Sequence, residues 1–222
     1  MNDDLFADEL VLFGEFAEAE SQLAESQRAH HEQKRAVAMH RNTSRIETRR
    51  AKTEAHLRDL LPTDFTPGTS WHVISHGDVD AMSYLIHIVA TRLLTRVIIS
   101  TWCMAMPDIQ WIESAICAGR IGRVEFFLGE IFPSQYGDEY LKLCELERED
   151  LIAFRISRNH SKIMICESDG EPIVIESSAN VNTNPRIEQT AIHCSAELAA
   201  FYADFFQGIR DIDGKRHERA TS

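Results

Sequence analysis

The stretch of residues 159–189, NHSKIMICESDGEPIVIESSANVNTNPRIEQ, contains two short apolar runs joined by a turn. The runs SKIMICE and EPIVIES are rich in residues that favour strands, and SDG between them predicts a hairpin. His160 and Lys162 lie two apart at the start of the first run, while Ser178 and Asn180 lie two apart where the second run ends. Side chains two apart in a strand share a face of the sheet. The stretch therefore predicts two adjacent strands, each with a polar pair on one face.

These residue types suit phosphate chemistry. An imidazole can act as nucleophile or proton carrier, and an ammonium group can hold phosphate oxygens. The side chains of Ser178 and Asn180 can donate hydrogen bonds to the same oxygens. Glu188, just beyond the loop, can accept the imidazole N–H and fix the orientation of the His160 ring. Taken alone, His160 and Lys162 also fit two solvated residues on an edge strand, and only the whole set favours a phosphate site.

Strands and helices alternate on both sides of this stretch, which predicts an α/β sandwich with a mixed sheet. The further predicted strands are WHVISH, RVIISTWCM, RVEFFLGEIF, LIAFRIS and QTAIHC. The predicted helices are DVDAMSYLIHIVATRLL, PDIQWIESAICAGR, SQYGDEYLKLCELERED and SAELAAFYADFFQGIRD. The first has an Asp cap, and the second has a proline in its first turn.

The first part of the chain has a different composition. Residues 1–61 are rich in Ala, Glu, Gln, Arg and Lys, with no proline and one glycine, which predicts a long helix, a helical hairpin or a coiled coil. Two prolines and a glycine then predict a linker over residues 62–70. We expect the α/β domain to occupy residues 71–210 and residues 211–222 to form a disordered tail.

Charge is unevenly distributed along the 222 residues, whose net charge is −12. Residues 1–27 carry −8, residues 28–58 carry 9 Lys or Arg against 3 Glu (+6), and residues 59–222 carry 14 against 24 (−10). The total argues against a protein that coats nucleic acid indiscriminately. The basic segment fits nucleic-acid contact, a solvated helix face or pairing with residues 1–27, and the sequence leaves these alternatives open.

The sequence also bears on location and cysteine chemistry. No run of eighteen apolar residues is present, so we expect no membrane span. The acidic start MNDDLFADEL lacks the basic region of a secretory signal, and we expect a cytoplasmic protein. The five cysteines include no CxxC pair, which favours reduced thiols over a redox or metal role.

Three further residues are candidates for the rim of the cleft. His76 and Asp78 lie in SHGDVD, which fits either a metal site or a strand-to-helix turn with an Asp cap, and the turn is favoured. Trp102 ends a predicted strand and fits a rim position or a half-buried core position. We predict no metal site.

The pattern HSKIMICE followed by SSAN resembles the HxKxxxxD…GSxN signature of the phospholipase D superfamily. The segment RVIISTWCMAMPDIQWIESAICAGRIGRVEFFLGE is similar to the strand–helix–strand unit that precedes that signature in the superfamily. SHGDVDAMSYLIHIVATRLL lies where its small single-motif nucleases have their first strand and helix. The resemblance covers roughly residues 71–206 and implies a phospholipase D-like α/β/α sandwich.

The resemblance also implies roles for particular residues. His160 matches the histidine that forms a phosphohistidine intermediate, and Lys162 matches the phosphate-binding lysine. Ser178 and Asn180 match the serine and asparagine of the second motif. Glu188 matches the glutamate that braces the histidine. This chemistry needs neither a metal ion nor a cofactor, so we expect none.

Only one HxK motif is present, whereas the superfamily uses two motifs that face each other. The resemblance therefore implies a homodimer with the site across its twofold axis. The leading hypothesis is a metal-independent phosphodiesterase, a nuclease that acts on DNA or RNA without membrane contact.

The chain departs from the signature at Glu167, where the superfamily has Asp, and at Ser177, where it has Gly. The alternative hypothesis is a weak or inactive module that binds nucleic acid or a partner, with turnover lost through these changes. A phospholipase is the third and least favoured hypothesis.

Overall fold

The computed structural model of the protein describes residues 53, 55–77, 79–181 and 186–213. The chain divides into two compact units, residues 1–49 and 50–222, and every described residue belongs to the second. Most of the segment expected to be helical, with its basic stretch, lies outside the described residues, as do residues 214–222. Among the described residues, Leu57 and Leu61 are buried in the core of the α/β unit.

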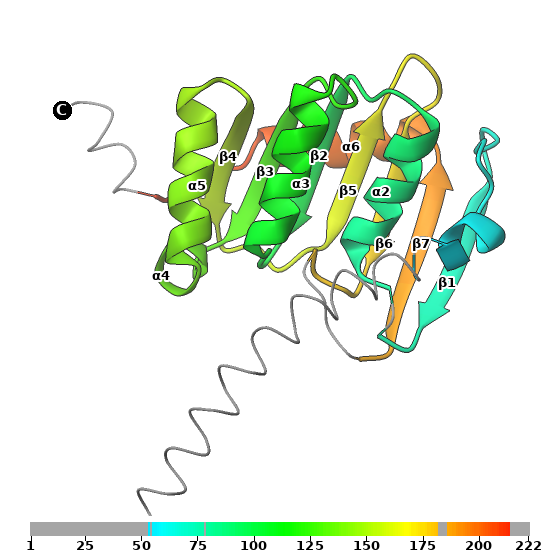
Figure 1. The fold of residues 1–222 in the computed structure, drawn as a ribbon, viewed down its shortest axis with the longest axis horizontal. Helices are drawn as coiled ribbons and strands as arrows, with labels where there is room; N and C mark the ends of the chain where they lie inside the picture. Colours follow the sequence, from blue (N-terminus) through cyan, green and yellow to red (C-terminus); the bar gives the residue numbers. More distant parts are fainter. Residues whose placement is uncertain (1–52, 54, 78, 182–185, 214–222) are drawn as a thin grey trace, which may run out of the picture. The chain divides into compact units, whose positions relative to one another are not determined.

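A mixed sheet of seven strands forms the centre of this unit, in the order β1-β7-β6-β5-β2-β3-β4 (Figure 1). The strands are β1 (Ser70–Ser75), β2 (Arg96–Thr101), β3 (Val124–Gly129), β4 (Ile152–Ser157), β5 (Ile163–Glu167), β6 (Ile173–Ser177) and β7 (Glu188–Cys194). Strands β2, β3 and β4 are parallel, and all other neighbouring pairs are antiparallel. The predicted mixed sheet and the hairpin between β5 and β6 are confirmed.

Helices cover both faces of the sheet. They are α2 (Ala81–Thr91), α3 (Met106–Cys117), α4 (Phe132–Gln135), α5 (Gly137–Arg148) and α6 (Ala196–Gln207). Figure 1 shows α2, α3 and α5 in front of the sheet and α6 behind it. One apolar core lies under the front helices, and a smaller one, including Ile98, Ile165 and Phe206, lies under α6. The predicted α/β class is therefore confirmed as three layers.

Local signals explain where the helices begin. Asp80 caps α2, since its Oδ1 accepts a hydrogen bond from the backbone N of Ser83 at 2.9 Å, as the Asp-cap interpretation predicts. Pro107 lies in the first turn of α3, and Ser195 caps α6 through the backbone N of Leu198. The single helix predicted over residues 134–150 is wrong in one respect. The backbone leaves the helical conformation at Tyr136 and so divides α4 from α5.

The topology brings several chain segments to one end of the sheet. The carboxyl ends of β1, β6, β2, β3 and β4 meet there with the amino ends of β7 and β5. We call it the His160 end, the lower end in Figure 1, and we call the opposite end the Glu167 end. In open α/β sheets, ligands bind outside the carboxyl ends of the parallel strands. The fold therefore presents the residues before β5 and after β6 at the customary place for a site.

Candidate phosphate-binding site

His160 and Lys162 come together at this end of the sheet. The Lys162 Nζ lies 3.2 Å from the His160 Nδ1 and donates a 2.6 Å hydrogen bond to the His160 carbonyl oxygen. Because β5 begins at Ile163, the two residues precede the strand, and their predicted position within it is wrong. The imidazole is exposed and the lysine is half-buried. The ammonium group and the imidazole therefore lie next to each other at a solvent-accessible position.

Asn159 holds this segment in place. Its Nδ2 donates to the Ser100 Oγ at 2.9 Å and to the Phe127 carbonyl oxygen at 2.7 Å. Its Oδ1 accepts from the backbone N of Ser161 at 3.0 Å and from the Ser161 Oγ at 2.7 Å. The ladder between β2 and β5 ends at the pair Ser100 and Ile163. Side-chain bonds thus replace the ladder where His160 leaves the sheet, and they fix its position against β2 and β3.

Ser178 and Glu188 form a second pair beside the first. The Ser178 Oγ donates to the Glu188 Oε2 and accepts from the backbone N of Gln189 at 3.0 Å. Ser178 follows the end of β6 and is exposed, whereas Glu188 begins β7 and has 8% of its surface exposed. The hydroxyl thus holds the carboxylate at the His160 end.

Asn180 differs from Ser178 in its surroundings. Its Oδ1 is buried and has no hydrogen-bond partner among the described residues. Leaving a buried acceptor unpaired costs about 1–3 kcal/mol, so such an atom calls for an explanation. An unpaired acceptor next to the Ser178–Glu188 pair can receive a hydrogen bond from a further group that enters the site.

The electrostatic environment of Lys162 reflects its position. Burial lowers the pKa of Lys162, and the neighbouring Cys103 and Glu188 side chains offset part of that shift. A partly dehydrated ammonium group interacts more strongly with an anion than a fully solvated one. The position of Lys162 therefore favours an anionic ligand beside its ammonium group.

The two departures from the signature have structural uses. The Ser177 Oγ lies 2.8 Å from the Thr190 Oγ1 and accepts from the backbone N of Ala179 at 3.1 Å, so this hydroxyl links β6 to β7. Glu167 lies at the other end of β5, roughly 13 Å from its start at about 3.3 Å per residue. Its Oε1 accepts from the Arg96 Nη1 at 3.4 Å. Both side chains thus have partners within the sheet.

Of the three candidate rim residues, Trp102 lies beside the site. Its ring centroid is 5.3 Å from that of His160, at an interplanar angle of 57°. His76 is exposed and directly follows β1, whose Ser75 pairs with Glu188. Asp78 lies outside the described residues. No group of three or more His, Cys, Asp or Glu side chains in the described part of the chain is arranged to hold a metal ion.

Asn159 was not predicted as a positioning residue, although it directly precedes the predicted site. Its partners Ser100 and Phe127 lie 59 and 32 residues away in the chain. Only the strand order brings them together. A polar side chain beside a candidate nucleophile was the one local signal available.

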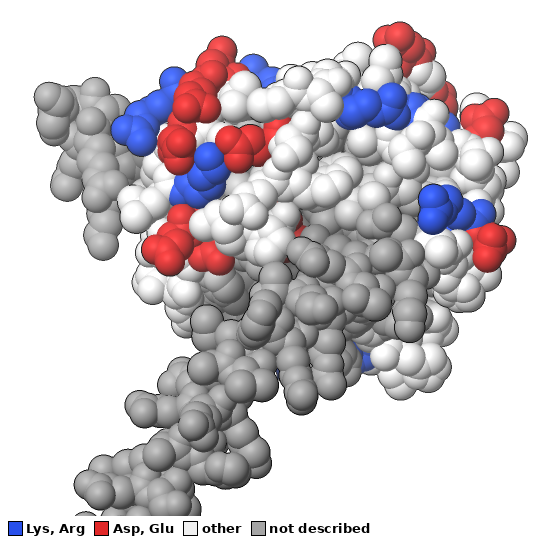
Figure 2. Space-filling view, in the orientation of Figure 1, with Lys and Arg blue, Asp and Glu red and all other residues white. Residues whose placement is uncertain are grey.

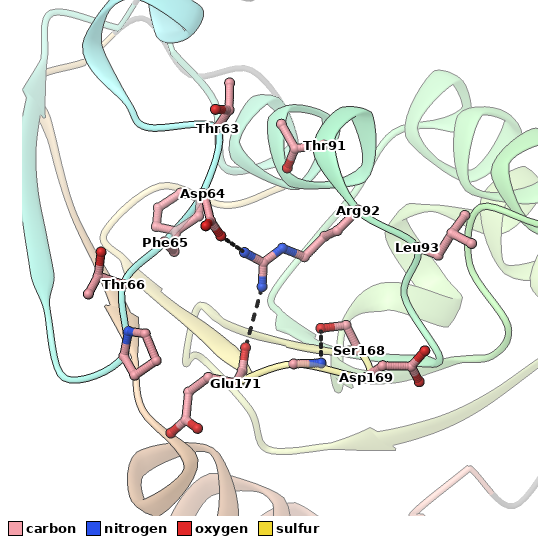
Figure 3. A pocket seen from close by; sticks show the side chains of 12 residues that line it. Thr63, Asp64, Phe65, Thr66, Thr91, Arg92, Leu93, Ser168, Asp169 and Glu171 are labelled. Atoms are coloured by element: carbon pink, nitrogen blue, oxygen red, sulfur yellow. Dashed lines mark hydrogen bonds and ion pairs between the residues drawn. The ribbon is translucent and has the colours of Figure 1, made fainter.

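A pocket of about 680 Å³ lies elsewhere, at the Glu167 end of the sheet. It is bounded by residues 63–67, the end of α2 and the turn between β5 and β6. Figure 3 shows Arg92 at its centre, bonded to the Asp64 carboxylate at 3.5 Å and to the Glu171 carbonyl oxygen at 3.4 Å. Its guanidinium group is already paired, and the pocket is separate from His160.

Charge on the described surface is mixed. On the face shown in Figure 2, acidic and basic side chains alternate without a continuous basic area among the coloured residues. Lys142 of α5, for example, pairs with Glu113 at 3.0 Å and with Glu145 at 3.5 Å. Among the described residues, no helix has both the length and the apolar composition needed to cross a membrane.

Comparisons with known proteins find distant structural likenesses. No family model and no curated protein sequence matches the chain. TrmBL2, an archaeal chromatin protein with "a novel mode of DNA binding", is 14% identical over 76% of this chain and 63% of its own. NucT from Helicobacter pylori is 16% identical over 63% of this chain and 94% of its own. Polyphosphate kinase from Porphyromonas gingivalis is 16% identical over 64% of this chain and 23% of its own.

Each of these three structures has a TM-score of 0.47. The chain spans less than two thirds of TrmBL2 and less than a quarter of the polyphosphate kinase. NucT and the polyphosphate kinase have phospholipase D superfamily folds. Likenesses this distant assign neither a family nor an activity to the chain.

Proposed function

We propose that this protein is a phosphodiesterase that cleaves nucleic acid through His160, without a metal ion, as a homodimer. One observation carries the proposal: the His160 imidazole and the Lys162 ammonium group lie 3.2 Å apart at the carboxyl end of the parallel strands. The Ser178–Glu188 pair lies at the adjacent strand ends. A nucleophile and a cation are two of the groups that phosphoryl transfer needs.

The reaction has two displacements. An unprotonated ring nitrogen of His160 attacks phosphorus, forming an N–P bond while the bond from phosphorus to the leaving oxygen breaks. The leaving oxygen takes a proton from a general acid. Water then attacks the phosphohistidine, gives up a proton to the same group, and releases His160 and the second product. Lys162 stabilises the charge on the phosphate oxygens throughout.

Phosphate binding also prepares the nucleophile. In the structure, Lys162 approaches the His160 Nδ1, which can accept a hydrogen bond from the ammonium group. Phosphate oxygens are strong, charged acceptors and compete for that group. The substrate therefore draws Lys162 to itself and releases a ring nitrogen lone pair for attack.

A second copy of the chain would supply the general acid. The sequence contains a single HxK motif, so His160 has to serve as nucleophile in one copy and as acid in the other. His160 is exposed at the end of the sheet, which leaves it accessible to a second copy.

The alternative of an inactive binding module rested on Ser177 and Glu167. The Ser177 hydroxyl bonds to Thr190 and to the turn after β6, and Glu167 is paired with Arg96 at the opposite end of the sheet. These contacts give both side chains a structural use, which favours the enzyme over the inactive module.

The test is cleavage of single- and double-stranded DNA and RNA in the presence of EDTA. We expect activity in wild type and a loss of at least about 10³-fold in His160→Ala, since removing a covalent nucleophile has effects of this size or larger. His72→Ala is the matched control, because His72 is also exposed but projects from the middle of β1.

Each result bears on a different part of the proposal. Cleavage that EDTA abolishes contradicts the metal-independent mechanism. No cleavage of any of the four substrates by wild type contradicts the nuclease assignment, and equal activity in His160→Ala contradicts the role of His160. Salt-sensitive binding without turnover, lost on deletion of residues 28–58, supports the binding module instead.

A further inference from the structure

We propose that Trp102 is a stacking platform for an unpaired base next to His160, so that this site selects single-stranded nucleic acid. This inference rests on the proposed function, but it concerns binding and can be tested without turnover. Its basis is an indole beside the candidate nucleophile, which packs on Gly129 of β3.

The indole lies at the end of a strand adjacent to the nucleophile. Trp102 follows the last residue of β2, and β2 is the neighbour of β5. Its ring centroid is 5.3 Å from that of His160, and the side chain is half-buried. A flat aromatic surface thus borders the imidazole on the β2 side, whereas the Ser178–Glu188 pair lies at the end of β6 and the start of β7.

The absence of a side chain at Gly129 leaves the space that the indole occupies. A Cβ at Gly129 would overlap the Trp102 Cδ1 and would lie 3.1 Å from its Nε1. Any larger residue at the end of β3 would therefore displace the ring. The main chain reinforces this packing, because the same Cβ would lie 3.0 Å from the Trp102 carbonyl oxygen. The ring is thus placed by its contact with β3, independently of a ligand.

Stacking on an aromatic side chain favours ligands whose base faces are free. In a duplex each base face is already covered by its neighbours, and reaching it requires unstacking. In a single strand the faces are available, and stacking on an aromatic side chain contributes about 1–3 kcal/mol per base. When Lys162 holds a phosphate, Trp102 lies at the end of the neighbouring strand, and neighbouring strands are about 4.8 Å apart. The site then receives a phosphate and an adjacent base together.

The test measures binding in the His160→Ala background, in which no phosphohistidine can form. The probes are a labelled oligothymidylate, an abasic oligodeoxynucleotide of equal length and charge, and a duplex. We expect Trp102→Ala to weaken oligothymidylate binding about 5- to 150-fold, the equivalent of 1–3 kcal/mol. Trp102→Phe should restore most of it. Binding of the abasic strand and the duplex, and the salt dependence, should be unchanged.

A second measurement leaves Trp102 in place, so it does not depend on the folding of a variant. In a chain with Trp71→Phe and Trp111→Phe, Trp102 is the one remaining tryptophan. Oligothymidylate should quench its emission and the abasic strand should not. Trp111→Phe alone, on α3, is the control for the binding assay.

Equal losses for the oligothymidylate and the abasic strand, or no loss, overturn the inference. A loss that accompanies dissociation of a dimer also overturns it, and assigns Trp102 to the contact between copies. If wild type cleaves nucleic acid but Trp102→Ala does not change oligothymidylate binding, the stacking inference fails and the proposed function stands. If Trp102 binds the single strand but wild type never cleaves, stacking stands and the proposed function fails.

Discussion

The two ends of the sheet use charge in opposite ways. At the Glu167 end, Arg96 lies between two carboxylates, 3.0 Å from the Glu125 Oε1 and 3.4 Å from the Glu167 Oε1, and Arg123 adds a contact of 3.6 Å to Glu125. At the His160 end, the Lys162 ammonium group donates to the neutral His160 carbonyl oxygen and approaches the imidazole.

This difference distinguishes a structural charge cluster from a binding site. Opposite charges that pair directly tie β2, β3 and β5 together and leave little attraction for a ligand. An ammonium group that donates to neutral acceptors, in a position that lowers its pKa, retains its attraction for an anion. The experiments below ask whether the two ends differ in function as they do in charge.

Among the charged groups at the two ends, the largest expected effect comes from removing the cation at the His160 end. Lys162→Met should lower kcat for nucleic-acid cleavage about 10²- to 10³-fold, because Lys162 stabilises charge that develops on the phosphate oxygens. Lys142→Met is the matched control, since Lys142, on α5, is paired with Glu113 of α3. Steady-state kinetics on both variants checks this. A kcat in Lys162→Met equal to that of the control would contradict the assigned role.

The dependence of activity on pH compares Lys162 with an ordinary, fully solvated lysine. Lys162 must be protonated to hold phosphate, and burial lowers its pKa below the ordinary value of 10.5. Activity should therefore be present below the pKa of Lys162 and fall as the pH rises through it, at a lower pH than an ordinary lysine would give. A pH–rate profile tests this. An alkaline limb that persists unchanged in Lys162→Met would assign the titration to another group.

The smallest effect is expected at the Glu167 end. Arg96→Met should lower the free energy of unfolding by about 1 kcal/mol, since solvent screens part of this half-buried ion-pair cluster. Cleavage per folded molecule should be unchanged. Arg123→Met should cost less, because Arg123 is more exposed and its contact is longer. Urea unfolding and kinetics on the same samples check both. A kcat loss in Arg96→Met as large as that in Lys162→Met would abolish the distinction between the two ends.

Much of the fold could be predicted from the sequence because its signals are local. Alternating apolar residues mark the strands, and Asp80, Pro107 and the SDG turn mark boundaries that depend on a few neighbouring residues. The spacing of His160 and Lys162 likewise indicated a shared position. The structure brings them together, although just outside the strand.

The remainder depends on contacts between distant segments. The hydrogen bonds of Asn159 to Ser100 and Phe127 exist because β5 lies beside β2 and β2 beside β3. The packing of Trp102 on Gly129 follows from the same strand order, in which β2 lies beside β3. The spacing of residues along the chain carries no information on which strands become neighbours, so these positioning residues emerge only from the structure.

The stereochemistry at phosphorus tests the central claim most directly. A substrate with a chiral, isotopically labelled phosphorothioate linkage distinguishes two displacements from one. Attack by His160 followed by attack of water inverts the phosphorus twice, so we predict net retention of configuration, lost together with activity in His160→Ala. Net inversion would show that water attacks directly, and it would contradict the phosphohistidine on which the proposed function depends.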